Sequence, residues 1–414
     1  MKIFLVITLL LVAVSSNAQW VQMSNGMGTD KGVYSFATIG NNIFAGTWST
    51  GVFLSTNNGT NWTPVNNGLT NQNVNTLVAS GGNLFAGTYE GVYISTNNGT
   101  SWSIVNNGLS NIIVRSLCVS GTNVFAGTGV GVYLSTNNGS SWTSVNNGLT
   151  ALNMRAIAVS GINIFAGTVG GGVFLSTNNG SNWTAINNGL TSQYIYSFAV
   201  SGGNIFAGSN SGVFLSTNNG INWAEVNNGL TNLFINSLAV SGTNIFAGTQ
   251  NVPSGGSIFL STNNGINWIQ KNQGINVTPI ILSLLISNNY IYAGTGGTSV
   301  YRRSLSEIIG IQNISTEIPP AYSLSQNYPN PFNPTTTIKF TIPKVSSPHD
   351  LGGDLVLLKV FDVSGREVET LINEQLQPGT YSTQWNASAY SSGVYFYKIE
   401  SGDFSETKRM LLIK

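Results

Sequence analysis

Residues 19–304 contain very few side chains that could carry out acid–base chemistry. The acidic residues in this range are Asp30, Glu90 and Glu225, and the one histidine of the chain, His349, lies beyond it. Glycoside hydrolysis requires a pair of flanking carboxylates, and the usual zinc and general-base sites rely on histidine. The three acidic residues hold different positions of a repeat described below, so we do not expect them to converge. The sequence therefore predicts a protein that is not an enzyme, with no cofactor and no metal ion.

Two arginines form the most specific candidate for a binding site. Arg115 and Arg155 hold the same position in neighbouring repeats, near the start of a strand that we expect to be innermost in the fold. Two adjacent guanidinium groups predict a site for a small anion or a carboxylate. The alternative is that Glu90 pairs with them and that solvent screens their charge.

Three aromatic residues are expected on the same face as these arginines. Trp48 and Tyr89 lie in loops that vary between repeats, and Tyr194 lies in a variable segment that leads into a strand. Variable loops on a rigid scaffold are where recognition usually occurs. These rings could stack on sugars, although isolated exposed aromatic residues are also common. The lone Cys118 is interpreted as a small core residue.

A repeat indicates which elements position these residues. Six tryptophans each close the same phrase, as in residues 55–62, and the steps between them are 40, 40, 41, 40 and 45 residues: Trp62, Trp102, Trp142, Trp183, Trp223 and Trp268. Each unit contains about four short strands separated by Asn-Gly and Ser-Gly turns. A period of ~40–45 residues with four strands per unit is typical of a β-propeller blade.

Counting strands at the two ends of the repeat region predicts how the propeller closes. Strands of the first three types occur seven times, and the last set, ending near residue 302, is followed by no tryptophan strand. Residues 19–27, which include Trp20, match a tryptophan strand and its exit turn with nothing before them. We therefore predict an all-β, seven-bladed propeller over residues 19–304, whose N-terminal strand completes the last blade.

The repeated phrase resembles the Asp-box, also called the BNR repeat, of sialidase-like propellers. Ser55, Gly59 and Trp62 match its pattern, whereas Asn57 replaces the aspartate and Asn61 the threonine. In that family the box is a structural hairpin away from the active face, which implies a structural role for these residues and for the other tryptophans of the repeat. The family's enzymes use an arginine triad, a Tyr/Glu pair and an aspartate, or paired carboxylates. A glycan-active enzyme, sialidase-like or glycoside hydrolase-like, is therefore one alternative, and a purely structural surface protein is another.

Targeting and composition place the protein outside the cytoplasm. Residues 1–18 read as a signal peptide, with Lys2 before an apolar run over residues 3–14 and small residues at 16–18. That run is too short to span a membrane, and no later segment qualifies. With 15 basic and 14 acidic residues, a net charge of +1, the chain has no electrostatic signature of nucleic-acid binding.

The chain changes character after residue 304. Residues 305–325, with two adjacent prolines, are predicted to be a linker. Residues 326–414 contain alternating strands separated by glycine turns, which predicts a small Ig-like β-sandwich of about seven strands. Spaced motifs mark this segment: Pro329, Asn330, Pro331, Phe332, Gly365, Gly379, Tyr381, Gly393 and Tyr395.

These motifs resemble the type A C-terminal sorting domain of the type IX secretion system. The resemblance implies delivery to the periplasm and then transport across the outer membrane, with the secretion machinery as a partner. Release from the cell or attachment to its surface commonly follows. The combined prediction is a secreted or surface-attached, non-catalytic binding or scaffold propeller, whose ligand is an extracellular polysaccharide or a protein.

Overall fold

The computed structural model describes residues 19–109, 113–241, 244–250, 255–275, 277–309, 312–315, 317–344, 354–376, 378–388 and 390–414. The predicted signal peptide, residues 1–18, and His349 lie outside the described residues.

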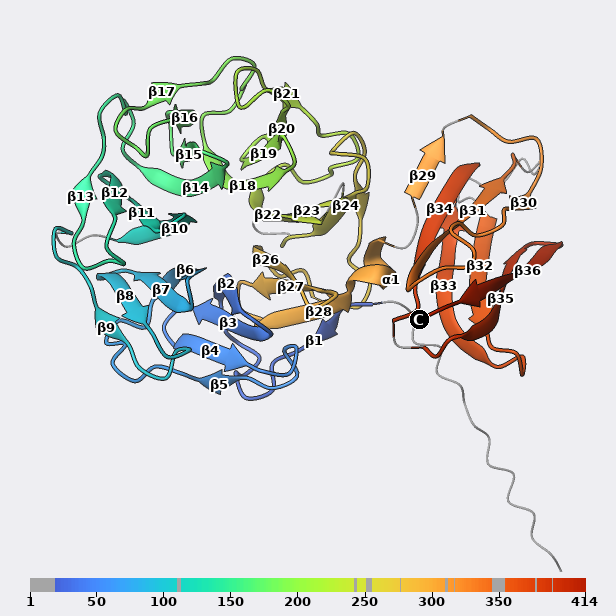
Figure 1. Cartoon of the computed structure of the whole chain (residues 1–414). Coiled ribbons are helices and arrows are strands. Elements are labelled where there is room, and N and C mark those ends of the chain that lie inside the picture. Colours follow the sequence, from blue (N-terminus) through green and yellow to red (C-terminus); the bar gives the residue numbers. More distant parts are fainter. Residues whose placement is uncertain are drawn as a thin grey trace, which may run out of the picture.

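Four-stranded antiparallel sheets, seven among the described residues, form a ring over the first three quarters of the chain (Figure 1). Six of the sheets follow the chain order, with these strands: β2 (Val33–Ile39), β3 (Asn42–Thr47), β4 (Gly51–Ser55) and β5 (Thr63–Pro64); β6 (Val74–Ser80), β7 (Asn83–Thr88), β8 (Gly91–Ser95) and β9 (Ser103–Ile104); β10 (Val114–Ser120), β11 (Asn123–Thr128), β12 (Gly131–Ser135) and β13 (Thr143–Ser144); β14 (Met154–Ser160), β15 (Asn163–Thr168), β16 (Val173–Ser176) and β17 (Thr184–Ala185); β18 (Ile195–Ser201), β19 (Asn204–Ser209), β20 (Gly212–Ser216) and β21 (Ala224–Glu225); β22 (Ile235–Ser241), β23 (Asn244–Thr249), β24 (Ile258–Ser261) and β25 (Ile269–Gln270).

The remaining sheet joins the two ends of the ring. It contains β26 (Ile281–Ser287), β27 (Tyr290–Thr295), β28 (Val300–Ser304) and the N-terminal β1 (Val21–Gln22), in the order β1-β28-β27-β26. β1 pairs antiparallel with β28, and Val21 lies opposite Arg302. The first strand of the protein, β1, is therefore the outermost strand of the last sheet in the ring.

The hydrophobic core of the ring lies between neighbouring sheets. In each repeat the second strand is almost wholly buried, and Phe44 of β3 has no exposed surface. Phe44 packs in one cluster with Val74 and Leu77 of the next sheet. A Cβ atom on Gly46 would lie 2.7 Å from the Val74 side chain, so only glycine permits this close approach of the two sheets.

The hairpins that contain the repeated phrase, here called the tryptophan hairpins, connect the third and fourth strands. In the first of them, Asn58 and Gly59 have φ values of 55° and 79°, which asparagine and glycine tolerate best. The Ser55 hydroxyl accepts the Gly59 N–H at 2.8 Å, and the Asn57 side-chain oxygen accepts the Asn61 N–H at 2.9 Å. A neutral amide therefore holds this turn without a carboxylate.

Each tryptophan connects its own sheet to the preceding one. Trp102 donates its backbone N–H to the Asn67 carbonyl at 2.8 Å and its indole N–H to the Val65 carbonyl at 2.7 Å. Trp20 makes the same two bonds at the seam, to the carbonyls of Gln273 and Lys271, both at 2.7 Å. The seam is thus held by the contacts that connect the other sheets.

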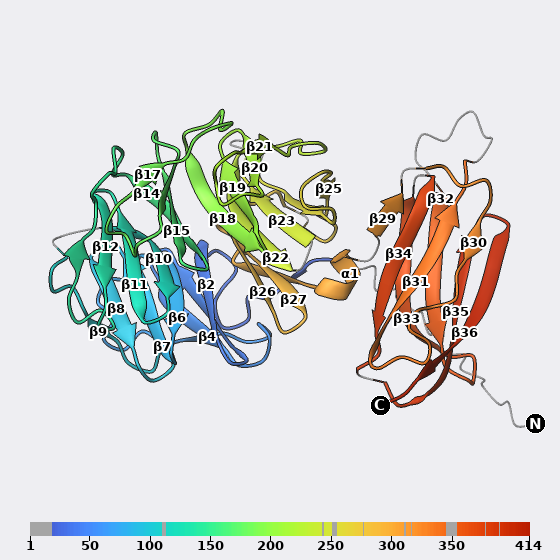
Figure 2. The same ribbon diagram turned by 45° about the horizontal axis from the view of Figure 1, so that its top comes forward.

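The C-terminal residues form a separate unit of two four-stranded antiparallel sheets (Figure 2). Their strands are β29 (Gln312–Ser315), β30 (Ser323–Leu324), β31 (Thr335–Ile342) and β34 (Gly379–Asn386) in one sheet, and β32 (Asp354–Phe361), β33 (Glu367–Leu376), β35 (Gly393–Ser401) and β36 (Phe404–Leu412) in the other. A single core packs between the two sheets, and Phe332 lies in it with its ring 5.5 Å from that of Trp385.

The predicted linker, residues 305–325, contains regular structure. The helix α1 (Leu305–Ile309) packs on the last sheet of the ring, where Ile308 is fully buried beside Trp20 and Tyr301. β29 pairs with β34, and Leu324 of β30 is buried in the C-terminal core. The prediction of a linker differs from the structure because the apolar residues of this segment follow no helix or strand periodicity. They pack on surfaces of the propeller and of the C-terminal unit that a local sequence pattern does not reveal.

Candidate ligand-binding site at the channel mouth

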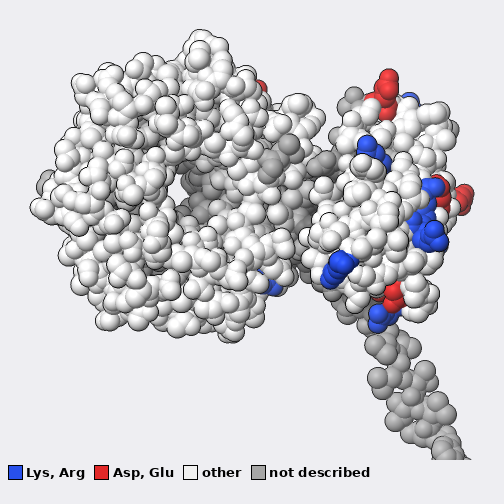
Figure 3. Space-filling model, in the orientation of Figure 1, with Lys and Arg blue, Asp and Glu red and all other residues white. Residues whose placement is uncertain are grey.

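Every innermost strand of the ring carries a β-bulge at its second residue. The extra residue has no partner on the neighbouring strand, and a bulge of this kind redirects the side chain. Because the seven bulges hold the same strand position, one such residue from each sheet lies at the same end of the ring. The ring has a central opening (Figure 3), and this end is called the channel mouth. The bulge residues are Tyr34, Asn75, Arg115, Arg155, Tyr196, Asn236 and Leu282.

The structure brings the two predicted arginines together at this channel mouth. Arg115 is half-buried, and its Nη1 donates a hydrogen bond to the side-chain oxygen of Asn153. Arg155 is exposed, and its guanidinium carbon lies 5.8 Å from the centre of the Tyr196 ring, within the range of a cation–π contact. Burial and the positive charge of Arg155 lower the pKa of the Arg115 guanidinium. The two cations therefore repel each other, which favours an anion between them.

Aromatic rings flank the arginine pair on one side. The centre of the Trp48 ring lies 5.7 Å from that of Tyr34 and 5.0 Å from that of Tyr89, and the Trp48 and Tyr89 rings meet edge to face. Burial and Tyr89 raise the pKa of Tyr34, whereas the charge of Arg155 acts to lower it. Tyr34 lies on β2 and Arg155 on β14, so this electrostatic effect links sheets that are not neighbours.

A second aromatic group lies on the other side of the arginines. Tyr196, under Arg155, packs on Phe234 with 4.7 Å between the ring centres. Tyr194 is 43% exposed and forms an isolated bridge with Val169, and its charge contributes to raising the pKa of Tyr196, after burial. Five of the six predicted binding residues therefore belong to one group at the channel mouth, which consists of the arginine pair and the rings on either side of it.

Glu90 is the predicted residue that does not join this group. It is exposed in the loop between β7 and β8, and among the described residues it forms no ion pair. Its backbone carbonyl accepts a hydrogen bond from Asn106 at 2.7 Å. The charged and phenolic groups that act on the pKa of Arg115 are Arg155 and Tyr89.

The other acidic residues of the ring are engaged elsewhere. Asp30 forms an ion pair with Lys31 at 3.1 Å. Glu225 lies on the outermost strand β21, where its carboxylate accepts a hydrogen bond from Thr191. Asp30, Glu90 and Glu225 thus occupy three different kinds of element. In the part of the chain that the structure describes, no group of three or more His, Cys, Asp or Glu side chains could hold a metal ion.

Two bulge residues have a structural role at the mouth. The Asn75 amide donates to the Val114 carbonyl of the next sheet at 3.0 Å. The Asn236 amide donates to Gln250 at 3.1 Å and to the Ile281 carbonyl at 3.3 Å. These asparagines connect neighbouring innermost strands, so their amide groups are already engaged within the ring.

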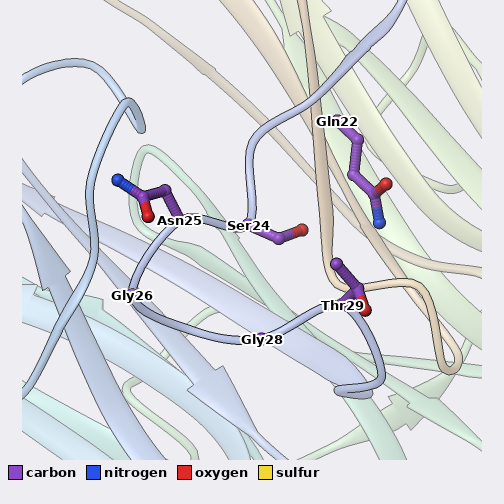
Figure 4. A pocket seen from close by; sticks show the side chains of 6 residues that line it. All are labelled: Gln22, Ser24, Asn25, Gly26, Gly28 and Thr29. Atoms are coloured by element: carbon purple, nitrogen blue, oxygen red, sulfur yellow. The ribbon is translucent and has the colours of Figure 1, made fainter.

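A separate hollow of about 470 Å³ lies beside the closing strand (Figure 4). Its cause is a local change in the repeat. In the first sheet, the Asn66 side chain accepts the Val52 N–H at 2.7 Å and donates to the Thr50 carbonyl at 3.0 Å. At the seam, the same position of the repeat is occupied by Ser24. The buried Ser24 hydroxyl has no hydrogen-bond partner in the part of the chain that the structure describes. The residues that line the hollow carry no charge: Gln22, Ser24, Asn25, Gly26, Gly28 and Thr29.

Sequence reasoning missed Tyr34, Tyr196 and Phe234 as members of the site. A signal was present, since Tyr34 and Tyr196 hold the same repeat position as Arg115 and Arg155. Aligning the repeats on the second residue of the innermost strand would have found both tyrosines. Phe234 directly precedes such a strand, and its contact with Tyr196 depends on the packing of two sheets.

Solved structures with the same fold define the class of the ring. The chain is similar to PorZ, an essential bacterial surface component of the type IX secretion system of Porphyromonas gingivalis, with 16% identity and a TM-score of 0.53. That alignment covers 92% of this chain, which spans 59% of the PorZ chain. YCF48 bound to D1 peptide is similar at 17% identity and a TM-score of 0.58, over 70% of this chain and 98% of YCF48.

An ancestral GH74 enzyme is also similar, at 19% identity and a TM-score of 0.55, over 69% of this chain and 49% of the enzyme. These likenesses show that the ring has the β-propeller fold. No curated protein sequence matched the chain.

The C-terminal unit has a more specific relationship. Residues 326–414 match the family described as the secretion system C-terminal sorting domain, which confirms the prediction for this segment. The domain indicates export by the type IX secretion system and interaction with its machinery. Among the described residues, no helix combines the length and apolar character needed to cross a membrane. Figure 3 shows the charged side chains concentrated on this unit, while the visible face of the propeller is almost free of them.

Proposed function

We propose that the protein is an exported, non-catalytic binding protein, in which a seven-bladed Asp-box propeller presents a ligand site and an Ig-like sorting domain directs secretion. The signal peptide would deliver the chain to the periplasm, and the sorting domain would direct it to the cell surface or beyond. The observation that carries the proposal is the pair Arg115 and Arg155, which has no acidic partner among the described residues and lies between aromatic rings at the channel mouth.

Two further observations support binding rather than catalysis. The acidic residues of the propeller lie on different elements and do not form the flanking carboxylate pair that glycoside hydrolysis requires. Propellers of this fold also include YCF48, which is bound to a D1 peptide in its structure, and PorZ, which is a surface component of a secretion system. Both are consistent with recognition at a surface.

The test is a binding screen of the full chain against glycans, peptides and cell-surface extracts, beside the Arg115→Ala/Arg155→Ala variant. We expect the wild-type chain to bind and the double variant to lose about tenfold or more in affinity, because each charge-assisted hydrogen bond contributes roughly 1.5–3 kcal/mol. The matched control is Lys339→Ala/Arg409→Ala, which removes two exposed positive charges from the sorting domain instead.

Other results would change the assignment. Binding that both double variants retain would move the site away from the channel mouth. Turnover of a polysaccharide that is lost in Asp30→Asn, Glu90→Gln or Glu225→Gln would establish the glycan-active enzyme. If no ligand binds, the purely structural surface protein becomes the better description.

A further inference from the structure

We propose that the channel-mouth site takes a polypeptide segment, with a carboxylate between Arg115 and Arg155 and apolar side chains against the surrounding rim. The inference rests on the proposed function and specifies the class of ligand. The group that the arginines bind is a peptide carboxylate, which is either the C-terminus or an aspartate or glutamate side chain.

Exposed aliphatic side chains surround the arginines and distinguish a peptide from a sugar. Val130, Leu152 and Leu233, here called the aliphatic rim, are 53%, 41% and 41% exposed. An exposed apolar group rimmed by polar residues marks a site of protein interaction. Aromatic rings such as Trp48 can stack on sugar faces, but aliphatic side chains offer sugars no comparable contact.

Each member of the aliphatic rim is the sequence neighbour of a residue at the arginine pair. Leu152 precedes Asn153, which accepts the hydrogen bond from Arg115. Leu233 precedes Phe234, whose ring packs on Tyr196 under Arg155. Val130 follows Gly129, where a Cβ atom would lie 3.8 Å from an Arg115 nitrogen. The aliphatic rim and the groups around the two cations are therefore supplied by the same short segments of the chain.

The polar groups at the mouth fit a carboxylate better than sugar hydroxyls. The side-chain N–H groups of Asn75 and Asn236 donate within the ring. The two guanidinium groups are charged donors, which pair more strongly with a carboxylate than with a neutral hydroxyl, and they lie beside tyrosine and tryptophan rings. Arginine, tyrosine and tryptophan dominate the binding energy of protein interfaces, and their combination here matches that composition.

Arg115 is positioned before a ligand arrives. Its Nη1 is held by Asn153, and Arg155 rests on the Tyr196 ring, so both guanidinium groups have limited freedom. Groups that are already ordered lose less conformational entropy on binding, which increases affinity. A carboxylate between them neutralises two repelling charges in a partly buried place.

The experiment uses the full chain and three immobilised pools of random twelve-residue peptides: one with free C-terminal carboxylates, one amidated, and one amidated and free of aspartate and glutamate. Oligosaccharides of uronic acid form a fourth arm, because they carry carboxylates without aliphatic groups. Peptides selected from the pools are then titrated by fluorescence anisotropy against wild-type chain, Arg115→Ala/Arg155→Ala, Leu152→Ser/Leu233→Ser and the Lys339→Ala/Arg409→Ala control.

We expect binding from at least one carboxylate-containing pool and none from the pool that lacks all carboxylates. Affinity should fall about tenfold or more in the arginine variant and roughly fivefold in the leucine variant, and stay unchanged in the control. Preference for the free terminus over the amidated pool identifies a C-terminal carboxylate, whereas equal binding identifies acidic side chains.

The leucines are exposed at the surface, so the leucine variant is expected to keep the wild-type melting temperature, and Val130→Ser provides a second test of the rim. Binding of uronic-acid oligosaccharides that depends on the arginines but not on the leucines would overturn the inference and leave the proposed function intact. Absence of binding in all four arms would also overturn the inference, and the wider screen against glycans and cell-surface extracts then decides the proposed function.

Discussion

The bulge residues of the innermost strands show how one repeat position serves two purposes. Asn75 and Asn236 bond to the next sheet, whereas Arg115 and Arg155 project at the channel mouth without an acidic partner among the described residues. The bulge makes both outcomes available, because it frees one side chain per sheet from the pairing of the strands. Side-chain chemistry then decides whether the residue connects the sheets or stays available for the proposed ligand.

A residue in the sorting domain supplies a pH-dependent prediction. The Ser364 hydroxyl donates to Asp362 at 2.6 Å, and the Arg366 N–H donates at 3.1 Å, which holds the pKa of Asp362 below its usual value. Because the folded-state pKa is lower than the unfolded value of about 3.9, this stabilisation is complete above pH 4 and is lost as the pH falls through the folded-state value.

Asp362→Asn should therefore lower the melting temperature at pH 6 and have a smaller effect at pH 2.5. Calorimetry of the full chain at both pH values measures the difference between wild type and variant. A difference that is the same at both values would show that the charge of Asp362 does not contribute.

At the scale of elements, the turn that follows the closing strand β1 differs from the equivalent turn of the first sheet at two positions, which pack on each other in that sheet. In the first sheet Asn66 packs on a glycine, and a Cβ atom on Gly51 would lie 2.3 Å from the Asn66 side chain. In the sheet of β22–β25 the pair is Asn272 and Ser257, whose hydroxyl accepts the Asn272 amide at 3.1 Å.

At the seam the pair is Ser24 and Ser299, and Ser299 donates to the Gly28 carbonyl at 2.6 Å. Ser299 has a φ of 63°, as Gly51 has a positive φ, so its Cβ atom lies toward position 24 and the shorter Ser24 side chain leaves room for it.

Exchanging these two residues should therefore give strongly non-additive effects. Ser24→Asn alone is expected to destabilise the propeller by about 1–2 kcal/mol, since the larger side chain meets the Ser299 Cβ atom. Ser24→Asn/Ser299→Gly should recover that loss, because it restores the repeat pair and removes a non-glycine residue at φ 63°. Denaturant unfolding of wild type, the two single variants and the double variant gives the coupling free energy between positions 24 and 299. Additive changes in the free energy of unfolding would contradict a direct contact between the two residues.

For the whole molecule, stability depends on a contact between the two ends of the propeller. Trp20 is 2% exposed and bonds to Lys271, 251 residues away, while β1 is only two residues long. Trp20 is thus a main anchor of the closing strand, beside the pairing of β1 with β28. A ring closed in this way leaves no open end between the first and last sheets.

Trp20→Ala should destabilise the chain by about 3–5 kcal/mol, and it should also release β1. Limited proteolysis would then cut within residues 20–30, which wild type protects. Trp142→Ala is the matched control: it removes the same contacts from an interior sheet whose strand is connected on both sides. Equal proteolysis patterns for the two variants would contradict a special role for the seam.

Much of this architecture follows from local patterns. The spacing of Trp62, Trp102 and their equivalents predicts the four-stranded units, because Asn-Gly turns and alternating apolar residues act within a few residues of each other. The unfinished N-terminal strand predicts a partner at the far end, and β1 does pair with β28. The sorting domain was likewise recognisable from its spaced motifs, and the family match over residues 326–414 confirms the domain.

The tertiary structure decided the features that depend on neighbours in space. The contact of Tyr34 with Trp48, the approach of Arg155 to Tyr196 and the burial of Ile308 in α1 arise where separate sheets meet. The sequence by itself determined the repeat, the number of strands per unit and the sorting domain, since these depend on local turns and spacing. Which side chains gather at the channel mouth depends on bulges and on packing around the ring, and these exist only once the sheets have closed.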